Sequence, residues 1–132
     1  MFLFALAHAA APITVDVSGA ATDAGTVMCQ IFRSADGFPS TDAKAVAYST
    51  SLIKGGRAQC VFPAQPPGPI AIAAYHDENA NATLDTNFLG LPAEGYGFSN
   101  GAQAGMFGPP AFEAAVVTVA SAPLTLRLEL TK

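Results

Sequence analysis

The sequence predicts an all-β protein with a single antiparallel β-sandwich of about seven strands and one long loop rich in glycine, proline and aromatic residues. Short runs in which apolar and polar residues alternate recur along the chain, and clusters of turn residues separate them. The chain has 132 residues, which is the size of one ordinary domain. We therefore assign residues 10–132 to one domain.

The alternating runs define the expected strands. The run Leu124–Leu130 illustrates the pattern. Its four leucines face one way, while Thr125, Arg127 and Glu129 face the other, as in a half-buried antiparallel strand. The expected strands are Ile13–Val17, Thr26–Arg33, Ala45–Ile53, Arg57–Phe62, Ile70–His76, Val116–Val119 and Leu124–Leu130.

Turn residues lie between these runs. Asp36-Gly37 follows the second strand, and Lys54-Gly55-Gly56-Arg57 has the composition of a tight hairpin between the third and fourth strands. The run Gln65-Pro66-Pro67-Gly68 introduces the fifth strand. Short connections of this kind are typical of a two-sheet sandwich.

The N-terminus has the character of a shortened signal peptide. Residues 1–9 are mostly apolar and include Ala7-His8-Ala9, a small-x-small pattern of the kind that signal peptidase cleaves. A basic n-region is missing. We expect an exported protein, periplasmic or secreted, in which residues 1–9 are the remnant of the signal.

The charges are distributed unevenly. The chain has a formal net charge of −4, and no lysine or arginine occurs between Arg57 and Arg127, whereas five acidic residues do. Such a segment attracts cations and repels phosphate backbones, so nucleic acid is not an expected partner. No apolar run approaches the roughly 20 residues needed to cross a bilayer, so no membrane span is expected.

The segment that follows the fifth strand has the beginning of a calcium-binding loop. It reads H-D-E-N-A-N-A-T-L-D, and it offers oxygen ligands at alternate positions. Oxygen ligands of this kind favour calcium over zinc or copper. The expected ligands are Asp77, Asn79, Asn81, the main-chain carbonyl of Thr83, and Asp85, and the expected cofactor is one structural Ca²⁺ ion.

Two positions depart from the helix-flanked calcium loop. Ala82 stands where that loop has glycine, and Phe88 stands where it has a bidentate glutamate. Glu78 or Glu94 would supply further metal ligands. The alternative is that these Asp and Asn side chains form successive Asx-turns and bind no ion.

The long loop also carries aromatic residues that admit two interpretations. In the first, Tyr96, Phe98, Phe107 and Phe112 form a ligand-binding platform for a glycan or a partner protein. In the second, the same rings pack as a minor core beneath their own loop. The partner, protein or glycan, is not identified by the sequence.

Cys29 and Cys60 are the only cysteines, and each lies in an expected strand. They either form a disulfide, which suits an exported domain, or pack as two buried free thiols. No C-x-x-C motif or Cys/His cluster indicates zinc binding or thiol redox chemistry.

The sequence does not present a complete set of catalytic residues, so we expect no enzymatic activity and assign no catalytic residue. The two histidines are His8 and His76, and neither G-x-S-x-G nor H-E-x-x-H occurs. A small hydrolase that uses His76 with an acidic partner, or a carboxylate pair such as Asp85 and Glu94, is the remaining alternative.

Three stretches carry a resemblance to a known family. They read H-D-E-N-A-N-A-T-L-D-T-N-F-L-G-L-P-A-E-G-Y-G-F-S-N, F-G-P-P-A-F-E-A-A and G-T-V-M-C-Q-I-F-R-S-A-D-G-F-P. The chain resembles the bacterial family called domain of unknown function 2141, from Gly19 to about Leu130. The family pattern usually has glycine at the position of Ala82. The resemblance implies an exported sandwich, prealbumin-like or immunoglobulin-like, with no established activity.

Overall fold

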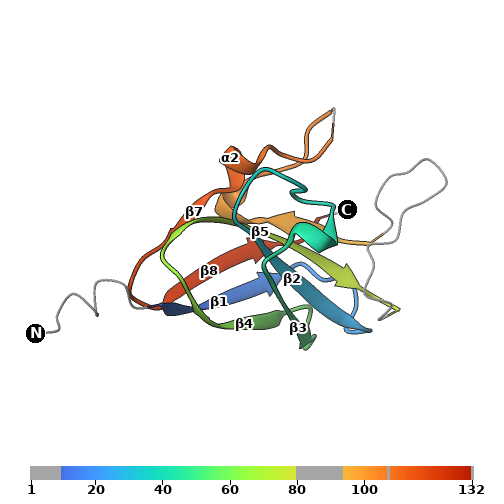
Figure 1. Ribbon diagram of the computed structural model, residues 1–132. Coiled ribbons are helices and arrows are strands. Elements are labelled where there is room, and N and C mark those ends of the chain that lie inside the picture. The colour runs from blue at the N-terminus through green and yellow to red at the C-terminus, as the bar shows by residue number, and fades with distance from the viewer. Residues whose placement is uncertain (1–9, 80–93, 107, 132) are drawn as a thin grey trace, which may run out of the picture.

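The structure is a computed structural model that describes residues 10–79, 94–106 and 108–131. It contains two packed β-sheets, so the predicted all-β sandwich is confirmed (Figure 1). Eight strands lie in the described residues, with short helical turns between some of them. In chain order the elements are β1 (Ala11–Ser18), β2 (Thr26–Phe32), η1 (Asp42–Lys44), β3 (Ala47–Leu52), β4 (Ala58–Gln65), β5 (Gly68–Asp77), β6 (Tyr96–Phe98), η2 (Ser99–Gly101), α2 (Phe112–Ala115), β7 (Val117–Val119) and β8 (Leu124–Glu129).

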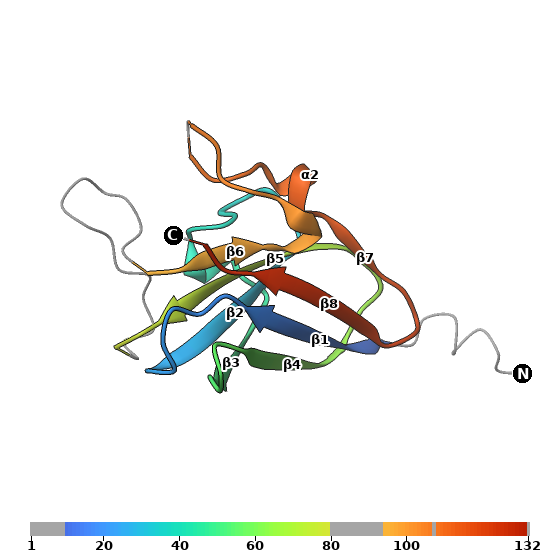
Figure 2. The ribbon, with the colours of Figure 1, turned by 180° about the vertical axis from the view of Figure 1, so that it is seen from behind.

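The smaller sheet has three strands in the order β4-β1-β8, which lie side by side as one layer (Figure 2). β1 pairs antiparallel with β4 and parallel with β8. The parallel pair departs from the all-antiparallel sandwich expected from the sequence. The parallel pairing is possible because residues 19–123 connect β1 to β8, and this connection is long enough for a crossover.

The larger sheet has five strands. Four follow the order β3-β2-β5-β6, and β7 pairs with the beginning of β5. β5 is the central strand, and its residues from Ile70 to Asp77 are all buried. β6 falls within the stretch that the sequence predicted to be loop. Its three residues are too few to show an alternating pattern.

The main core lies between the sheets. Alternate residues of β1 and β2 point inward and are fully or almost fully buried, as the period-two pattern predicted. Leu128 and Leu130 are 4% exposed in the same core, whereas Arg127 and Glu129 face solvent, which confirms the prediction for the last strand.

The hairpin between β3 and β4 also confirms the sequence prediction. Lys54 and Arg57 pair across the turn, and Gly55 and Gly56 have φ angles of 63° and 76°. Two successive residues with positive φ define the type of tight turn that glycine favours. This hairpin carries the chain from the larger sheet to the smaller one.

A second, smaller core covers the outer face of the larger sheet. Ser99, at the start of η2, links this core to the sheet. Its hydroxyl accepts a hydrogen bond of 2.8 Å from the Ile72 N–H and donates one of 2.6 Å to the Ala115 carbonyl. Ser99 is fully buried. One hydroxyl thus connects η2 to both β5 and α2.

In the described residues, no helix is long and apolar enough to span a membrane.

Candidate metal centre at the neck of the β5–β6 loop

The neck of the loop is the place where β5 ends and β6 begins. Tyr75 and Tyr96 are paired in register, and the His76 N–H donates a hydrogen bond of 2.8 Å to the Gly95 carbonyl. Further from the sheet, the Glu78 N–H donates a 2.8 Å hydrogen bond to the Glu94 side-chain carboxylate. The two ends of the intervening segment are therefore held together.

Two carboxylates are buried at this neck. Asp77 is 3% exposed and Glu94 is 4% exposed. An ionised carboxylate loses several kcal/mol of hydration in such a position, and hydrogen bonds or a bound cation must offset that loss. The Glu78 N–H provides one such bond to Glu94, of the stronger, charge-assisted type.

Gly25 lies against the same neck from the loop that precedes β2. Its φ angle is +73°, and a Cβ atom at this position would lie 2.0 Å from the Asp77 carbonyl oxygen and 2.7 Å from the Glu78 carbonyl oxygen. Only glycine permits both this conformation and this close approach. The neck is therefore enclosed by backbone on the β2 side as well as on the β6 side.

His76 is buried next to the neck, with 1% of its surface exposed. Its Nε2 lies 2.7 Å from the Ala24 carbonyl oxygen. A carbonyl oxygen only accepts hydrogen bonds, so Nε2 carries a proton and is the donor in this bond. Nδ1 is buried and has no hydrogen-bond partner within residues 10–79, 94–106 and 108–131. Successive residues of a strand face opposite sides, so His76 points into the sandwich while Asp77 points out.

The predicted calcium ligands fall partly within this geometry. Asp77 and Asn79, with the further ligands Glu78 and Glu94, lie at the neck, whereas Asn81, Thr83 and Asp85 lie outside the described residues. Within the residues that the structure describes, no group of three or more His, Cys, Asp or Glu side chains is arranged to hold a metal ion.

The predicted aromatic platform is largely a packed cluster. Phe98 is 8% exposed, and Tyr96 and Phe112 are half-buried. Phe38, which the sequence analysis did not single out, joins the rings: its centroid lies 6.0 Å from that of Phe98 and 5.8 Å from that of Phe112, both edge to face. Such pairs add roughly 0.5–1.5 kcal/mol beyond the burial of area. Phe107 lies outside the described residues.

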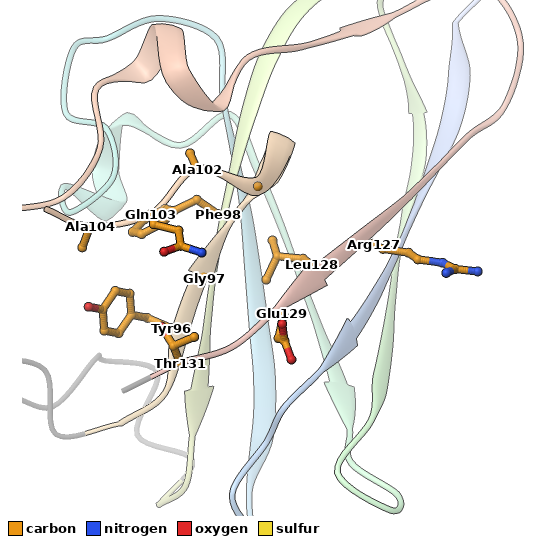
Figure 3. Close-up of a pocket in the computed structure, with 11 residues that line it drawn as sticks. Tyr96, Gly97, Phe98, Ala102, Gln103, Ala104, Arg127, Leu128, Glu129 and Thr131 are labelled. Carbon is orange, nitrogen blue, oxygen red and sulfur yellow. The ribbon is translucent and has the colours of Figure 1, made fainter.

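A small pocket of about 130 Å³ lies beside this cluster, between β6 and β8 (Figure 3). Tyr96, Gln103 and Glu129 are among its lining residues. Figure 3 shows the Arg127 side chain pointing away from Tyr96 and Gln103. β6 and β8 lie so close together here that a Cβ atom on Gly97 would be 2.4 Å from the Glu129 carbonyl oxygen.

The two cysteines face each other across the main core. Cys29 lies on β2 of the larger sheet, Cys60 lies on β4 of the smaller sheet, and both are fully buried free thiols in this structure. The hydrogen bond between the Cys29 and Cys60 side chains raises the pKa of Cys29 well above its usual value, and burial raises it further. The sequence showed that each lies in a strand, but it did not show that they meet.

Comparison with known proteins places the fold in a family. The described fold is a two-sheet β-sandwich in which residues 78–95 connect β5 to β6. The chain belongs to the family described as "Uncharacterized protein conserved in bacteria (DUF2141)", whose model matches residues 15–127. This confirms the resemblance seen in the sequence.

Two structures of the pilus-presented adhesin Cpa, a cysteine-to-alanine mutant and a second crystal form, are similar to the chain at 13% identity and a TM-score of 0.31. The similarity covers 96% of this chain and 28% of the adhesin chain. The chain therefore spans less than a third of the length of the adhesin. No curated protein sequence matches the chain.

Proposed function

We propose that this chain is an exported, noncatalytic β-sandwich accessory domain, in which one calcium ion bound at the neck orders the loop between β5 and β6. The observation that carries the proposal is the burial of two carboxylates, Asp77 and Glu94, at the point where the loop leaves and rejoins the sheet. Oxygen ligands at alternate positions after Asp77 would complete a shell of the kind that calcium prefers.

The charge of the surrounding chain supports a cation at this place. Lys and Arg are absent from the sequence between Arg57 and Arg127, so a metal ion would be the main positive charge of this segment. Calcium fits better than magnesium, because magnesium demands near-ideal octahedral geometry and gives up its waters reluctantly. The role is structural: the ion would hold the loop and would perform no chemistry.

The calcium proposal is tested by measuring ion binding directly. Isothermal titration of metal-free protein with CaCl₂ is expected to show one site with a Kd of about 10⁻⁴ M, at the weak end typical of extracellular modules. Glu94→Gln keeps a side chain that can accept the Glu78 N–H but removes the charge, so it is expected to weaken calcium binding at least about tenfold. Glu113→Gln changes the net charge equally at an exposed position and is expected to bind calcium like the parent. No binding heat in the parent protein would contradict the proposal.

The noncatalytic role is supported by the position of His76. This histidine is almost fully buried, its Nε2–H donates a hydrogen bond to the Ala24 carbonyl, and it does not line the pocket beside Tyr96. A general base needs access to its substrate. Turnover of ester or glycoside substrates that is lost in His76→Gln would contradict the proposal.

A second candidate function is recognition of a glycan or a partner protein through the aromatic segment. The half-buried Tyr96 ring at the edge of a small pocket favours it, because a tyrosine offers both an apolar face and a polar tip. This function predicts a hit on a glycan or peptide array that is lost in Tyr96→Ala. Tyr48→Ala, which removes a tyrosine that is 70% exposed elsewhere, is the matched control.

A further inference from the structure

A broad groove crosses the outer face of the smaller sheet. Its volume is about 680 Å³, and it extends over β1, β4 and β8 to the β3–β4 hairpin. Gln59, Asp16 and Arg127 lie next to one another across the three strands, because Asp16 pairs in register with both of the others. The groove thus has a flat polar floor made by the middle of the sheet.

Basic residues are concentrated in the lining of the groove although the protein is acidic. Three of the six basic residues of the chain line it: Lys54, Arg57 and Arg127. All three are exposed, and the ion pair found among the described residues is elsewhere, between Lys44 and Asp36. The three cations are therefore available to a ligand.

One carboxylate lies in the groove. Asp16 is half-buried in the floor, and its Oδ1 accepts a hydrogen bond of 2.9 Å from the Gln59 side chain. Asp16 offsets part of the charge of the three lining cations. A second carboxylate, that of Asp23, lies beside the hairpin that carries Lys54 and Arg57.

The hairpin holds two of the cations in place. The Asp23 carboxylate accepts hydrogen bonds of 2.9 Å from the N–H groups of both Gly55 and Gly56, and Lys54 and Arg57 pair across the turn. Because the turn is anchored at its tip and at its base, Lys54 and Arg57 are presented from a fixed backbone. A fixed backbone lowers the entropy lost when a ligand binds.

We propose that this groove binds an acidic polysaccharide whose carboxylates pair with Lys54, Arg57 and Arg127. The Gln59 amide and the Ser18 hydroxyl in the floor match sugar hydroxyls as hydrogen-bond partners. The inference does not depend on the calcium site, which lies on other strands.

The lining disfavours other polyanions. Among the described residues, no aromatic ring lines the groove, whereas single-stranded nucleic acid is held largely by stacking of its bases on such rings. The groove runs over the face of the sheet, where β1 is paired on both sides, so a peptide cannot extend the sheet there. An acidic polysaccharide needs neither a stacking platform nor a free strand edge.

Fluorescence anisotropy with labelled polygalacturonate oligomers tests the proposal. The titration is done in chelator at low ionic strength, so that calcium contributes nothing. The parent protein is expected to bind, and added salt is expected to weaken binding because the contacts are between exposed charges. Unlabelled polygalacturonate should compete, and neutral dextran should not.

Charge variants locate the binding site. Lys54→Gln and Arg57→Gln are each expected to weaken binding by about 2- to 5-fold, and the triple variant with Arg127→Gln is expected to abolish it. Asp16→Asn removes the opposing carboxylate and is expected to strengthen binding by a similar factor. Lys44→Gln, which changes the net charge equally but lies outside the groove, is expected to bind like the parent.

Any of four results would overturn the proposal. The triple variant binds like the parent, or Lys44→Gln weakens binding as much as Arg57→Gln does. A poly-glutamate peptide or a single-stranded oligonucleotide of equal charge binds more tightly than polygalacturonate, which would assign the groove to a different class of partner. Absence of binding in the parent protein would equally refute it. The replaced basic side chains are exposed, so circular dichroism spectra of all variants are expected to match the parent.

Discussion

The N–H of Glu78 donates a hydrogen bond of 2.8 Å to the carboxylate of Glu94, which lies sixteen residues further along the chain. This bond closes the neck of the β5–β6 loop and fixes one of the two buried carboxylates there. Hydrogen bonds to a charged acceptor contribute roughly 1.5–3 kcal/mol. The neck is therefore formed by the protein itself, and the calcium proposed there would add to an arrangement that already exists.

Gly25→Ala is predicted to disrupt the neck. The new Cβ atom would overlap the carbonyl oxygen of Asp77, so β5 and the loop before β2 must move apart. Gly55→Ala is the matched control: Gly55 also has a positive φ, of +63°, but a Cβ atom there meets nothing within 4 Å. In urea unfolding, the free energy of unfolding is expected to fall by about 1–3 kcal/mol more in Gly25→Ala than in Gly55→Ala. Equal losses would show that the neck is not tightly enclosed.

The same comparison extends to ion binding. Because Gly25 contacts the backbone of Asp77 and Glu78, its substitution is expected to weaken calcium binding, whereas Gly55→Ala leaves it unchanged. Isothermal titration of the two variants, at a temperature where both are folded, makes the comparison.

Ser99→Ala is predicted to be among the most destabilising conservative changes in the chain. It leaves the Ile72 N–H and the Ala115 carbonyl without the partner that Ser99 provides in a buried place. The expected loss is about 2–4 kcal/mol in the free energy of unfolding, measured by urea denaturation. Ser121→Ala, at an exposed position, is the control and is expected to change stability by less than about 0.5 kcal/mol. A loss below about 1 kcal/mol for Ser99→Ala would mean that water replaces the hydroxyl.

Asp23 is predicted to make the β3–β4 hairpin sensitive to acid. Hydrogen bonds from Gly56 and Gly55 lower the pKa of Asp23 below its usual value. A carboxyl group with a lowered folded-state pKa contributes stability above its unfolded pKa of about 3.9, and this contribution disappears as the pH falls through the folded value. NMR shifts of the Gly55 and Gly56 amides are expected to follow that titration. The Asp23→Asn variant should show no such step, and amide shifts that do not change at low pH in the parent would refute the assignment.

Cys29 and Cys60 are predicted to form a disulfide between the two sheets when the protein folds under oxidising conditions. The structure contains two free thiols, both buried in the main core, and Cys60 raises the pKa of Cys29. Closing the loop between them would stabilise the fold by about 3–4 kcal/mol in the chain-entropy model. Mass spectrometry after oxidative refolding is expected to show the loss of two hydrogens in the parent protein. The control variant Cys60→Ala keeps one cysteine, so it cannot form this disulfide and should not show the loss. Retention of both thiols in protein isolated from an oxidising compartment would support the alternative of a structural thiol pair.

The sandwich itself was predictable from local patterns. Six of the seven expected strands coincide with described strands to within about two residues, because alternation and turn glycines are properties of neighbouring residues. The last expected strand shows this well: Leu128 and Leu130 are buried and Arg127 is exposed, as the pattern requires. The seventh expected strand, Arg57–Phe62, is present as β4, which extends three residues further, to Gln65.

Relationships between distant segments were not predictable in the same way. β6 has three residues and no periodicity, and its pairing depends on the close approach of Gly97 to β8. The parallel pairing of β1 with β8 joins the two ends of the chain and leaves no local signal. The convergence of Lys54, Arg57 and Arg127 on one groove likewise depends on register between strands.

The candidate metal site was predicted in part. Spacing alone singled out Asp77 and Asn79, and Glu94 was named as a further ligand, but only the fold shows that Asp77 and Glu94 are buried at one neck. The role of Gly25 was missed, since nothing in its neighbourhood in the sequence points to a strand 52 residues later. A glycine directly before the expected strand Thr26–Arg33 was the one signal that the sequence offered.

Thermal melting of the full chain in 1 mM CaCl₂ and in chelator tests the central claim most directly. With a Kd of about 10⁻⁴ M, calcium at that concentration stabilises the folded state by roughly 1.4 kcal/mol, which raises the Tm by roughly 4–7 °C for a domain of this size. The account predicts this rise in the parent and in Glu113→Gln, and its loss in Glu94→Gln and Asp77→Asn. Equal Tm values with calcium and with chelator in the parent protein would contradict it.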